Sequence, residues 1–199
     1  MREALARVAP WVSPLTGVVR SVRMLPPLDP QLGHVAEAHH AMARLRWTRT
    51  SIQAAIAPRS FGKGLTPEAA QLSALYEGIE RYSGVYRDEI PTVVGSWCEM
   101  QDRAVDPVQS MGFSHRQYAQ RHAWIAQMPY PMVQVPDPLD PAVSLHWVEG
   151  YRLTDGRPCY VLAAQAYYDH PDHRLGFTMA DSNGCAAGAA YGDAVFSGL

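Results

Sequence analysis

The chain has 199 residues, of which 47% are hydrophobic and 18% are charged. This composition supports a folded protein with a sizeable core, and it excludes the disordered, collagen-like and coiled-coil classes. The formal net charge is -2 and no segment gathers basic residues into a run, so we expect no nucleic-acid partner. No apolar stretch is typical of a signal peptide or a transmembrane span, so we expect no membrane partner either. The three cysteines, Cys98, Cys159 and Cys185, are widely spaced, which indicates a reduced, cytoplasmic protein.

The first predicted elements lie before residue 58. Residues 11–30 are rich in prolines and turn formers, which predicts a strand with loops around it. Residues 35–46 are rich in alanine and contain few helix breakers, which predicts a short helix. Residues 47–57 carry β-branched side chains and end before Pro58, which predicts another strand.

The clearest predicted element is a helix over residues 66–86. Thr66 is a good N-cap, Pro67 suits the first helical position and Glu68 suits the first turn. At about 100° per residue the helix has an apolar face, which we expect to contact the core and which consists of Leu72, Leu75, Ile79, Tyr82 and Tyr86. The opposite face carries Ser73, Glu77, Glu80 and Arg81, and we expect small neighbours to leave room beside the two carboxylates, namely Ala69, Ala70, Ala74 and Gly84.

The sequence of the second half of the chain predicts a helix, then a hairpin, then a last helix. Ser114 and Gln117 form a capping-box pattern for a helix over residues 115–127. Two strands, residues 145–153 and 158–168, flank an Asp-Gly dipeptide at 155–156 that favours a tight hairpin. A glycine- and alanine-rich loop over residues 180–188 leads into a helix from about Tyr191. Since this helix has no cap before Leu199, we expect a single incomplete domain, 1–199, from a longer or split protein.

The two carboxylates on the predicted helix suggest a cation site. Glu77 and Glu80 are three residues apart and repel each other unless a cation lies between them. Mg²⁺ uses such carboxylates and completes its coordination with water and phosphate oxygens. The alternative is a solvated helix face with Arg81 as an ordinary surface residue. Gly62-Lys63-Gly64 precedes the helix N-terminus, where anions bind favourably, but it lacks the spacing of a P-loop.

Three segments together resemble the YcaO family of ATP-dependent enzymes that modify peptide backbones. They are GKGLT at 62–66, SALYEGIERY at 73–82 and DSNGCAAG at 181–188. The segments VSPLTGVV at 12–19 and WVEG at 147–150 are similar to the azoline-forming branch of that family. The resemblance implies an α+β fold of the YcaO type, with mixed sheets and packed helices, of which the carboxyl-terminal part is missing.

The resemblance also implies a site. Glu77 and Glu80 match one of the family's two pairs of metal-binding glutamates, and the residues at the family's nucleotide-binding positions are Ser73, Arg81, Ser182, Asn183, Gly184 and Asp193. Two positions depart from the family pattern, because Ala189 replaces an asparagine and Asp193 replaces a glutamate. The family's second carboxylate pair would follow Leu199, and no catalytic residue is assigned.

The activity implied by the resemblance is ATP- and Mg²⁺-dependent cyclodehydration. Cys, Ser or Thr residues of a ribosomally made precursor peptide become thiazolines or oxazolines through phosphorylation of the backbone amide oxygen. A leader-peptide-binding protein and a second copy of the chain are the expected partners, and we expect the 199-residue fragment alone to be inactive. A thioamide- or amidine-forming YcaO enzyme and a catalytically degenerate docking scaffold are the alternatives.

The remaining candidate residues are interpreted as structural rather than as metal-binding or catalytic. The His-Pro-Asp-His sequence at 170–173 is expected to be a surface turn rather than a metal site. Cys185 is interpreted as a small packing residue rather than a nucleophile. Trp97, Trp124 and Trp147 fit core or interface packing.

Overall fold

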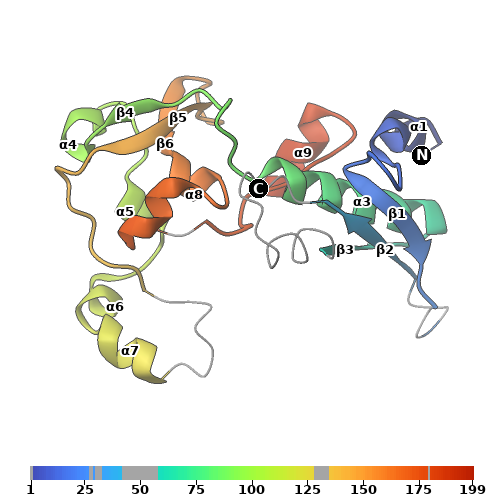
Figure 1. The fold of residues 1–199 in the computed structure, drawn as a ribbon, viewed down its shortest axis with the longest axis horizontal. Helices are drawn as coiled ribbons and strands as arrows, with labels where there is room; N and C mark the ends of the chain where they lie inside the picture. Colours follow the sequence, from blue (N-terminus) through green and yellow to red (C-terminus); the bar gives the residue numbers. More distant parts are fainter. Residues whose placement is uncertain (1, 27–28, 30–32, 42–57, 128–134, 179) are drawn as a thin grey trace. The chain divides into compact units, whose positions relative to one another are not determined.

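The computed structural model describes residues 2–26, 29, 33–41, 58–127, 135–178 and 180–199, which divide into two compact units. Unit 1 combines Met1–Arg87 with Ser182–Leu199, and unit 2 is Asp88–Asp181. Each unit has its own three-stranded antiparallel sheet with helices packed against it (Figure 1). The expected α+β class is therefore confirmed. In the described residues, parallel pairing is limited to isolated bridges such as that between Val12 and Val19.

Unit 1 is built on a sheet of order β1-β2-β3, formed by β1 (Val19–Met24), β2 (His34–His40) and β3 (Arg59–Gly64). Helix α3 (Pro67–Ser83) packs against all three strands. The amino-terminal helix α1 (Arg2–Val8), the short 3-10 turn η1 (Ala9–Trp11) and the last helix α9 (Tyr191–Gly198) complete the unit. As predicted, Thr66 caps α3, since its side chain accepts a hydrogen bond from the Ala69 backbone N–H, and a helix begins at Tyr191.

Small residues make up most of the face of α3 that packs against the sheet. The buried residues of α3 are Ala70, Ala74, Leu75 and Gly78. A Cβ added at Gly62 of β3 would lie only 2.1 Å from the Ala74 backbone nitrogen, so strand and helix are almost in backbone contact there. The prediction that the small residues leave room beside the carboxylates is therefore wrong for Ala70 and Ala74.

The large apolar residues of α3 take a lesser part in the core than predicted. Leu75 is buried, but Leu72 and Ile79 are only partly buried and pack around the edge of the cluster. Tyr82 and Tyr86 are also only partly buried. The helix turns its small face to the sheet because short side chains allow the closest approach, and the bulkier stripe then lies at the rim.

Residues 35–40 form a strand, and the helix predicted over 35–46 is wrong for them. Ala36 and Ala38 alternate with Glu37 and His39, and the two alanines are completely buried beneath α3. This period of two fits a strand whose two faces have different neighbours, and it overrides the helix propensity of alanine. The strand predicted over 47–57 lies outside the described residues. The Gly-Lys-Gly segment forms the end of β3 rather than a loop.

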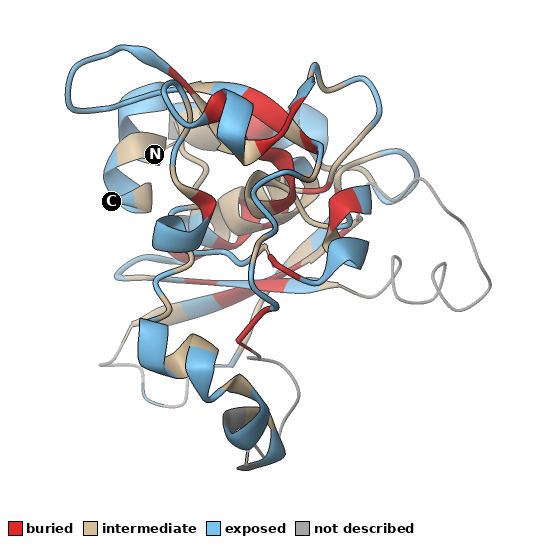
Figure 2. Cartoon of the chain, turned by 90° about the vertical axis from the view of Figure 1, so that its left-hand side faces the viewer, coloured by how far each residue is buried: buried red, intermediate tan, exposed pale blue. Residues whose placement is uncertain are grey.

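Unit 2 has a sheet of order β4-β5-β6, formed by β4 (Val93–Gly95), β5 (Leu145–Tyr151) and β6 (Pro158–Leu162). Its helical segments are α4 (Trp97–Met100), α5 (Pro107–Ser110), α6 (His115–Ala119), α7 (Arg121–Gln127), α8 (Ala163–Ala166) and η3 (Pro171–Leu175). The core contains Met100, Leu145, Trp147, Leu162, Ala164 and Phe177, and Figure 2 colours such buried positions red. Trp147 also donates a hydrogen bond from its indole to the Gly95 carbonyl at 2.8 Å.

Several predicted elements of unit 2 are confirmed with shorter bounds. The capping box of Ser114 and Gln117 is present, but the predicted helix is two helices because Gln120 leaves helical geometry with φ -106° and ψ 12°. The hairpin joins β5 to β6, although the second strand ends at Leu162, where α8 begins. No helix among the described residues is both long and apolar enough to cross a membrane.

Candidate functional site

The carboxylates of Glu77 and Glu80 lie on α3 with Arg81 between them. Arg81 Nη2 is 3.4 Å from Glu77 Oε1, and Arg81 Nε is 3.9 Å from Glu80 Oε1. Glu77 also accepts a hydrogen bond from the Phe61 backbone N–H at 3.2 Å through its other oxygen. Strand β3 and Arg81 therefore hold Glu77 in place, and one guanidinium reduces the repulsion between the two carboxylates.

Glu80 is the less exposed of the two carboxylates, with 18% of its side chain accessible against 32% for Glu77. Burial raises the pKa of Glu80, the Arg81 guanidinium opposes this effect, and the Glu77 carboxylate adds to it. Burial and a like charge thus both disfavour the ionised form of Glu80. A divalent cation placed beside the pair would remove both penalties.

These side chains line a hollow of about 370 Å³ in unit 1. It is formed by one face of α3, the loop that follows Asp181, and α9. Five of the residues singled out from the sequence contribute to its lining, namely Ser73, Glu77, Glu80, Arg81 and Ser182. The structure thus brings together residues that are about a hundred positions apart in the chain.

Three other residues singled out from the sequence are not part of this lining. Gly184 has a left-handed backbone, with φ +77°, and forms the turn that follows Asn183. The Asp193 carboxylate accepts a hydrogen bond from the Ala190 backbone N–H at 3.1 Å. In this structure Asp193 therefore caps the start of α9.

The lining of the hollow also includes five residues to which the sequence assigned no site role, namely Tyr76, Cys185, Ala186, Ala187 and Ser197. Tyr76 could have been found, because it lies three residues after Ser73 and four before Glu80 on the same helical face. Cys185 lines the hollow and is partly buried, so it faces the candidate site as well as serving packing. No sequence pattern pointed to Ser197, because its position in the lining depends on how α9 packs within unit 1.

The donor set of the hollow fits Mg²⁺. Its carboxylate and hydroxyl oxygens, from Glu77, Glu80, Ser73 and Ser182, are hard ligands of the kind that Mg²⁺ prefers. The hollow also contains a guanidinium that can pair with phosphate oxygens. Carboxylates, hydroxyls and one cation together suit a metal–phosphate ligand better than an apolar one.

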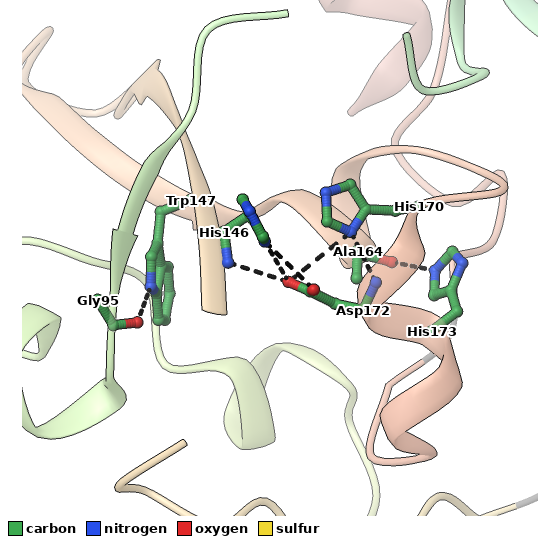
Figure 3. A network of polar contacts seen from close by, with 7 residues as sticks. All are labelled: Gly95, His146, Trp147, Ala164, His170, Asp172 and His173. Carbon is green, nitrogen blue, oxygen red and sulfur yellow. Dashed lines mark hydrogen bonds and ion pairs between the residues drawn. The ribbon is translucent and has the colours of Figure 1, made fainter. Parts of the chain in front are cut away.

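A second polar cluster, in unit 2, contradicts the surface turn predicted for residues 170–173. His170 is 2% exposed and Asp172 is 8% exposed. Figure 3 shows the Asp172 carboxylate between the rings of His170 and His146, the latter from β5. The turn can be buried because these polar groups pair with one another. The spacing within residues 170–173 does not predict this pairing, since His146 is distant in the sequence.

Comparison with known proteins identifies the family. A family model described as YcaO cyclodehydratase, ATP- and Mg²⁺-binding, matches residues 61–199. The chain belongs to the YcaO cyclodehydratase family. The resemblance expected from the three sequence segments is thereby confirmed. No match was found among curated proteins.

Solved structures support the YcaO assignment. The chain is similar over 98% of its length, with 31% identity and a TM-score of 0.80, to a heterocyclase in complex with substrate and cofactor. It is similar over 78% of its length, with 28% identity and a TM-score of 0.60, to the heterocyclase TruD. A YcaO protein from Methanopyrus kandleri bound with AMPPCP and Mg²⁺ shares the fold over 99% of the chain, at 22% identity and a TM-score of 0.52. The chain spans only 26%, 23% and 38% of these three proteins.

Proposed function

We propose that this chain is part of an enzyme that uses ATP and Mg²⁺ to form azoline rings in a ribosomally made precursor peptide. The observation that carries the proposal is the hollow on α3, where Glu77, Glu80 and Arg81 meet Ser73 and Ser182 in a YcaO chain. The similarity to a heterocyclase in complex with substrate and cofactor supports it. The substrate residues are Cys, Ser and Thr, which give thiazolines and oxazolines.

The proposed reaction removes the elements of water from the peptide at the expense of ATP. The substrate thiol or hydroxyl adds to the preceding peptide carbonyl, and its proton is lost while the carbonyl oxygen becomes an oxyanion. That oxygen attacks the γ-phosphorus of ATP, and ADP leaves. The carbon–oxygen bond then breaks, phosphate departs with the oxygen, and loss of the amide proton leaves the C=N bond of the azoline. Positioned charges stabilise such a phosphoryl transfer.

Each lining residue has a role that its chemistry suits. Glu77 and Glu80 would hold Mg²⁺, which would neutralise phosphate charge. Arg81 directs its guanidinium to the phosphates, where planar donors pair well with oxygen. Ser73 and Ser182 offer hydroxyls to the nucleotide. We extend the nucleotide-binding set to Asn183 and Gly184, which follow Ser182 in the loop, and to Asp193 at the start of α9.

The proposed partners are the precursor peptide, a leader-peptide-binding protein and a second copy of the chain. A catalytically degenerate docking scaffold is the second candidate function. Ala189, where the family has an asparagine, and the capping contact of Asp193 favour it. A thioamide- or amidine-forming enzyme would use the same ATP chemistry with a different nucleophile.

The decisive experiment replaces the carboxylates in the full-length protein. We expect Glu77→Gln and Glu80→Gln each to lower phosphate release by at least about a hundredfold, since each variant loses a charge that holds the metal. In Glu77→Gln the amide oxygen of the new side chain can still accept the Phe61 N–H, so circular dichroism should report an intact fold. Glu68→Gln, on the exposed first turn of the same helix, is the matched control.

The measurement pairs phosphate release with the mass of the peptide. Azoline formation removes the mass of one water molecule from the peptide for each modified residue. Unchanged phosphate release in both variants would exclude the metal role of this pair. A wild-type full-length protein that binds the peptide but never changes its mass would instead establish the scaffold.

A further inference from the structure

The polar cluster of unit 2 combines two imidazoles with one carboxylate. His146 stands at the start of β5, and His170 and Asp172 lie at the amino end of η3. His146 Nδ1 is 3.1 Å from Asp172 Oδ2 and 3.2 Å from Oδ1, and His170 Nδ1 is 3.8 Å from Oδ2 (Figure 3). One ligand atom from each residue lies within 4.8 Å of the other two.

The charge of Asp172 lacks a permanent cationic partner in the described part of the chain. Its ion pairs there are with His146 and His170 only, and imidazoles are charged only when protonated. Its other contact is the His146 backbone N–H, at 2.9 Å from Oδ2. A carboxylate that is 8% exposed, with two imidazoles and neither lysine nor arginine, has the surroundings of a metal-bound carboxylate.

We propose that His146, His170 and Asp172 bind a zinc ion. Zinc takes imidazole nitrogen and carboxylate oxygen at about 2.0–2.2 Å, so tetrahedral ligand atoms lie roughly 3.3–3.6 Å apart. The two measured separations from Asp172 Oδ2, 3.1 Å and 3.8 Å, lie on either side of this range. The ligand atoms of the three residues lie within 4.8 Å of one another, so rotations of the imidazole rings can bring the nitrogens to tetrahedral separation.

Coordination also changes one hydrogen bond. The Asp172 backbone N–H donates to His170 Nδ1 at 3.1 Å and holds that ring beside the carboxylate. Zinc bound through this nitrogen replaces the hydrogen bond by a stronger contact to the same atom. The His146 side chain is 39% exposed, so a water molecule can reach the ion and complete the tetrahedron.

Zinc at this position connects β5 to the segment 170–172 within unit 2. The ligands are 26 residues apart in the chain, so the metal closes a long loop and stabilises the folded unit by mass action. The site is chemically distinct from the hollow of unit 1, because nitrogen donors favour zinc and all-oxygen donors favour Mg²⁺. The zinc inference is therefore independent of the proposed function.

The test uses the full-length protein without an affinity tag, stripped of metal by a chelator and supplied with zinc. Zinc content per chain and the visible spectrum after Co²⁺ substitution are measured for the wild type and for His146→Gln, His170→Gln and Asp172→Asn. We expect each variant to bind one zinc fewer per chain, or to bind that ion at least about tenfold more weakly. His115→Gln, exposed on α6, is the matched control and should retain the full content.

Thermal unfolding supplies a second readout. Zinc should raise the unfolding midpoint of the wild type and of the control, and should leave that of His146→Gln unchanged. His146 is the most exposed of the three ligands, so its variant keeps the fold if a buried variant does not. Equal zinc content and an equal zinc-induced shift in the wild type and in His146→Gln would overturn the proposal and leave a hydrogen-bonded cluster only.

Discussion

Gly62 is the residue at which β3 comes closest to α3. A Cβ at this position would lie 2.1 Å from the Ala74 backbone nitrogen and 2.2 Å from the Ala70 carbonyl oxygen. Both neighbours are backbone atoms, so a side-chain rotation cannot relieve the overlap. The contact also fixes the position of Phe61, whose N–H binds Glu77. One glycine therefore couples the packing of unit 1 to the placement of a candidate metal ligand.

Gly62→Ala should lower the free energy of unfolding by about 1–3 kcal/mol or more, because an added methyl group overpacks a filled core. Gly192→Ala is the matched control, since no atom lies within 4 Å of the position of its Cβ and the residue is helical. That substitution should be neutral or slightly stabilising. Urea denaturation of both variants checks the pair, and equal midpoints would mean that helix and strand are further apart than described.

Glu37 is a buried carboxylate that also depends on its neighbours. It accepts hydrogen bonds from Arg23 on β1 and from Arg59 on β3, and only 2% of its side chain is exposed. The hydrogen bond from Arg23 lowers the pKa of Glu37 below its ordinary value, with smaller contributions from His39 and Arg59, while burial opposes them. The residue thus connects all three strands of the sheet through one charge.

The pH dependence of unfolding follows from that shift. Because the pKa is lower in the folded state, the contribution of Glu37 is full above the unfolded value of about 4.3 and is lost as the pH falls through the folded value. Glu37→Gln should therefore be less stable than the wild type at neutral pH. It should also lose less stability than the wild type between about pH 7 and about pH 3. Denaturation midpoints across this range test the prediction, with Glu68→Gln as the control; parallel curves for wild type and Glu37→Gln would contradict it.

At the scale of elements, α3 shows which features of a helix can be predicted from its sequence. Its start and the shared face of Ser73, Glu77 and Glu80 follow from local rules of capping and periodicity, and the structure agrees. The helix ends at Ser83, three residues before the predicted end at Tyr86. Its orientation was predicted less well, because hydrophobicity alone pointed to the large residues. The sheet instead selected the small residues, since Gly62 and two alanines permit a closer approach than any leucine.

Non-local pairing explains the other differences between sequence and structure. The alanines of β2 have helix propensity, and only the alternation imposed by α3 on one side and by Arg23 and Arg59 on the other makes the segment a strand. The histidine cluster needs His146 and Asp172 to meet across 26 residues. Neither set of contacts joins residues that are close together in the sequence, so local sequence patterns could not predict either one.

Leu75 tests the packing of α3 as a whole. It is 4% exposed within the cluster of Ala70, Ala74 and Val19. Leu75→Ala should lower the free energy of unfolding by about 2–5 kcal/mol, because the surrounding residues cannot fill the cavity. Ser83→Ala, exposed at the last residue of the same helix, should change it by less than about 0.5 kcal/mol. Chemical denaturation distinguishes them, and similar midpoints would place Leu75 outside the core.

At the scale of the whole molecule, the proposed function makes the site in unit 1 one side of a phosphoryl-transfer centre. The chain contributes the carboxylates of Glu77 and Glu80, and it spans 26% of the heterocyclase that it matches over 98% of its own length. The resemblance to the family implies a second carboxylate pair, which the proposed centre needs on the other side of the triphosphate. A triphosphate held from one side retains unneutralised charge on its other side. That charge raises the energy of the transition state of phosphoryl transfer.

The 199-residue chain alone should therefore leave a precursor peptide unmodified, even with ATP, Mg²⁺ and a leader-binding partner present. One carboxylate pair can hold one ion weakly, so weak nucleotide binding should remain measurable by calorimetry. Supplying polypeptide that carries the second carboxylate pair, in the same chain or as a separate one, should restore loss of one water per modified residue in the mass spectrum of the peptide. Glu77→Gln in that restored protein should again abolish the loss. Ring formation by the 199-residue chain alone would mean that its own carboxylates suffice, and the need for charge on both sides of the triphosphate would have to be abandoned.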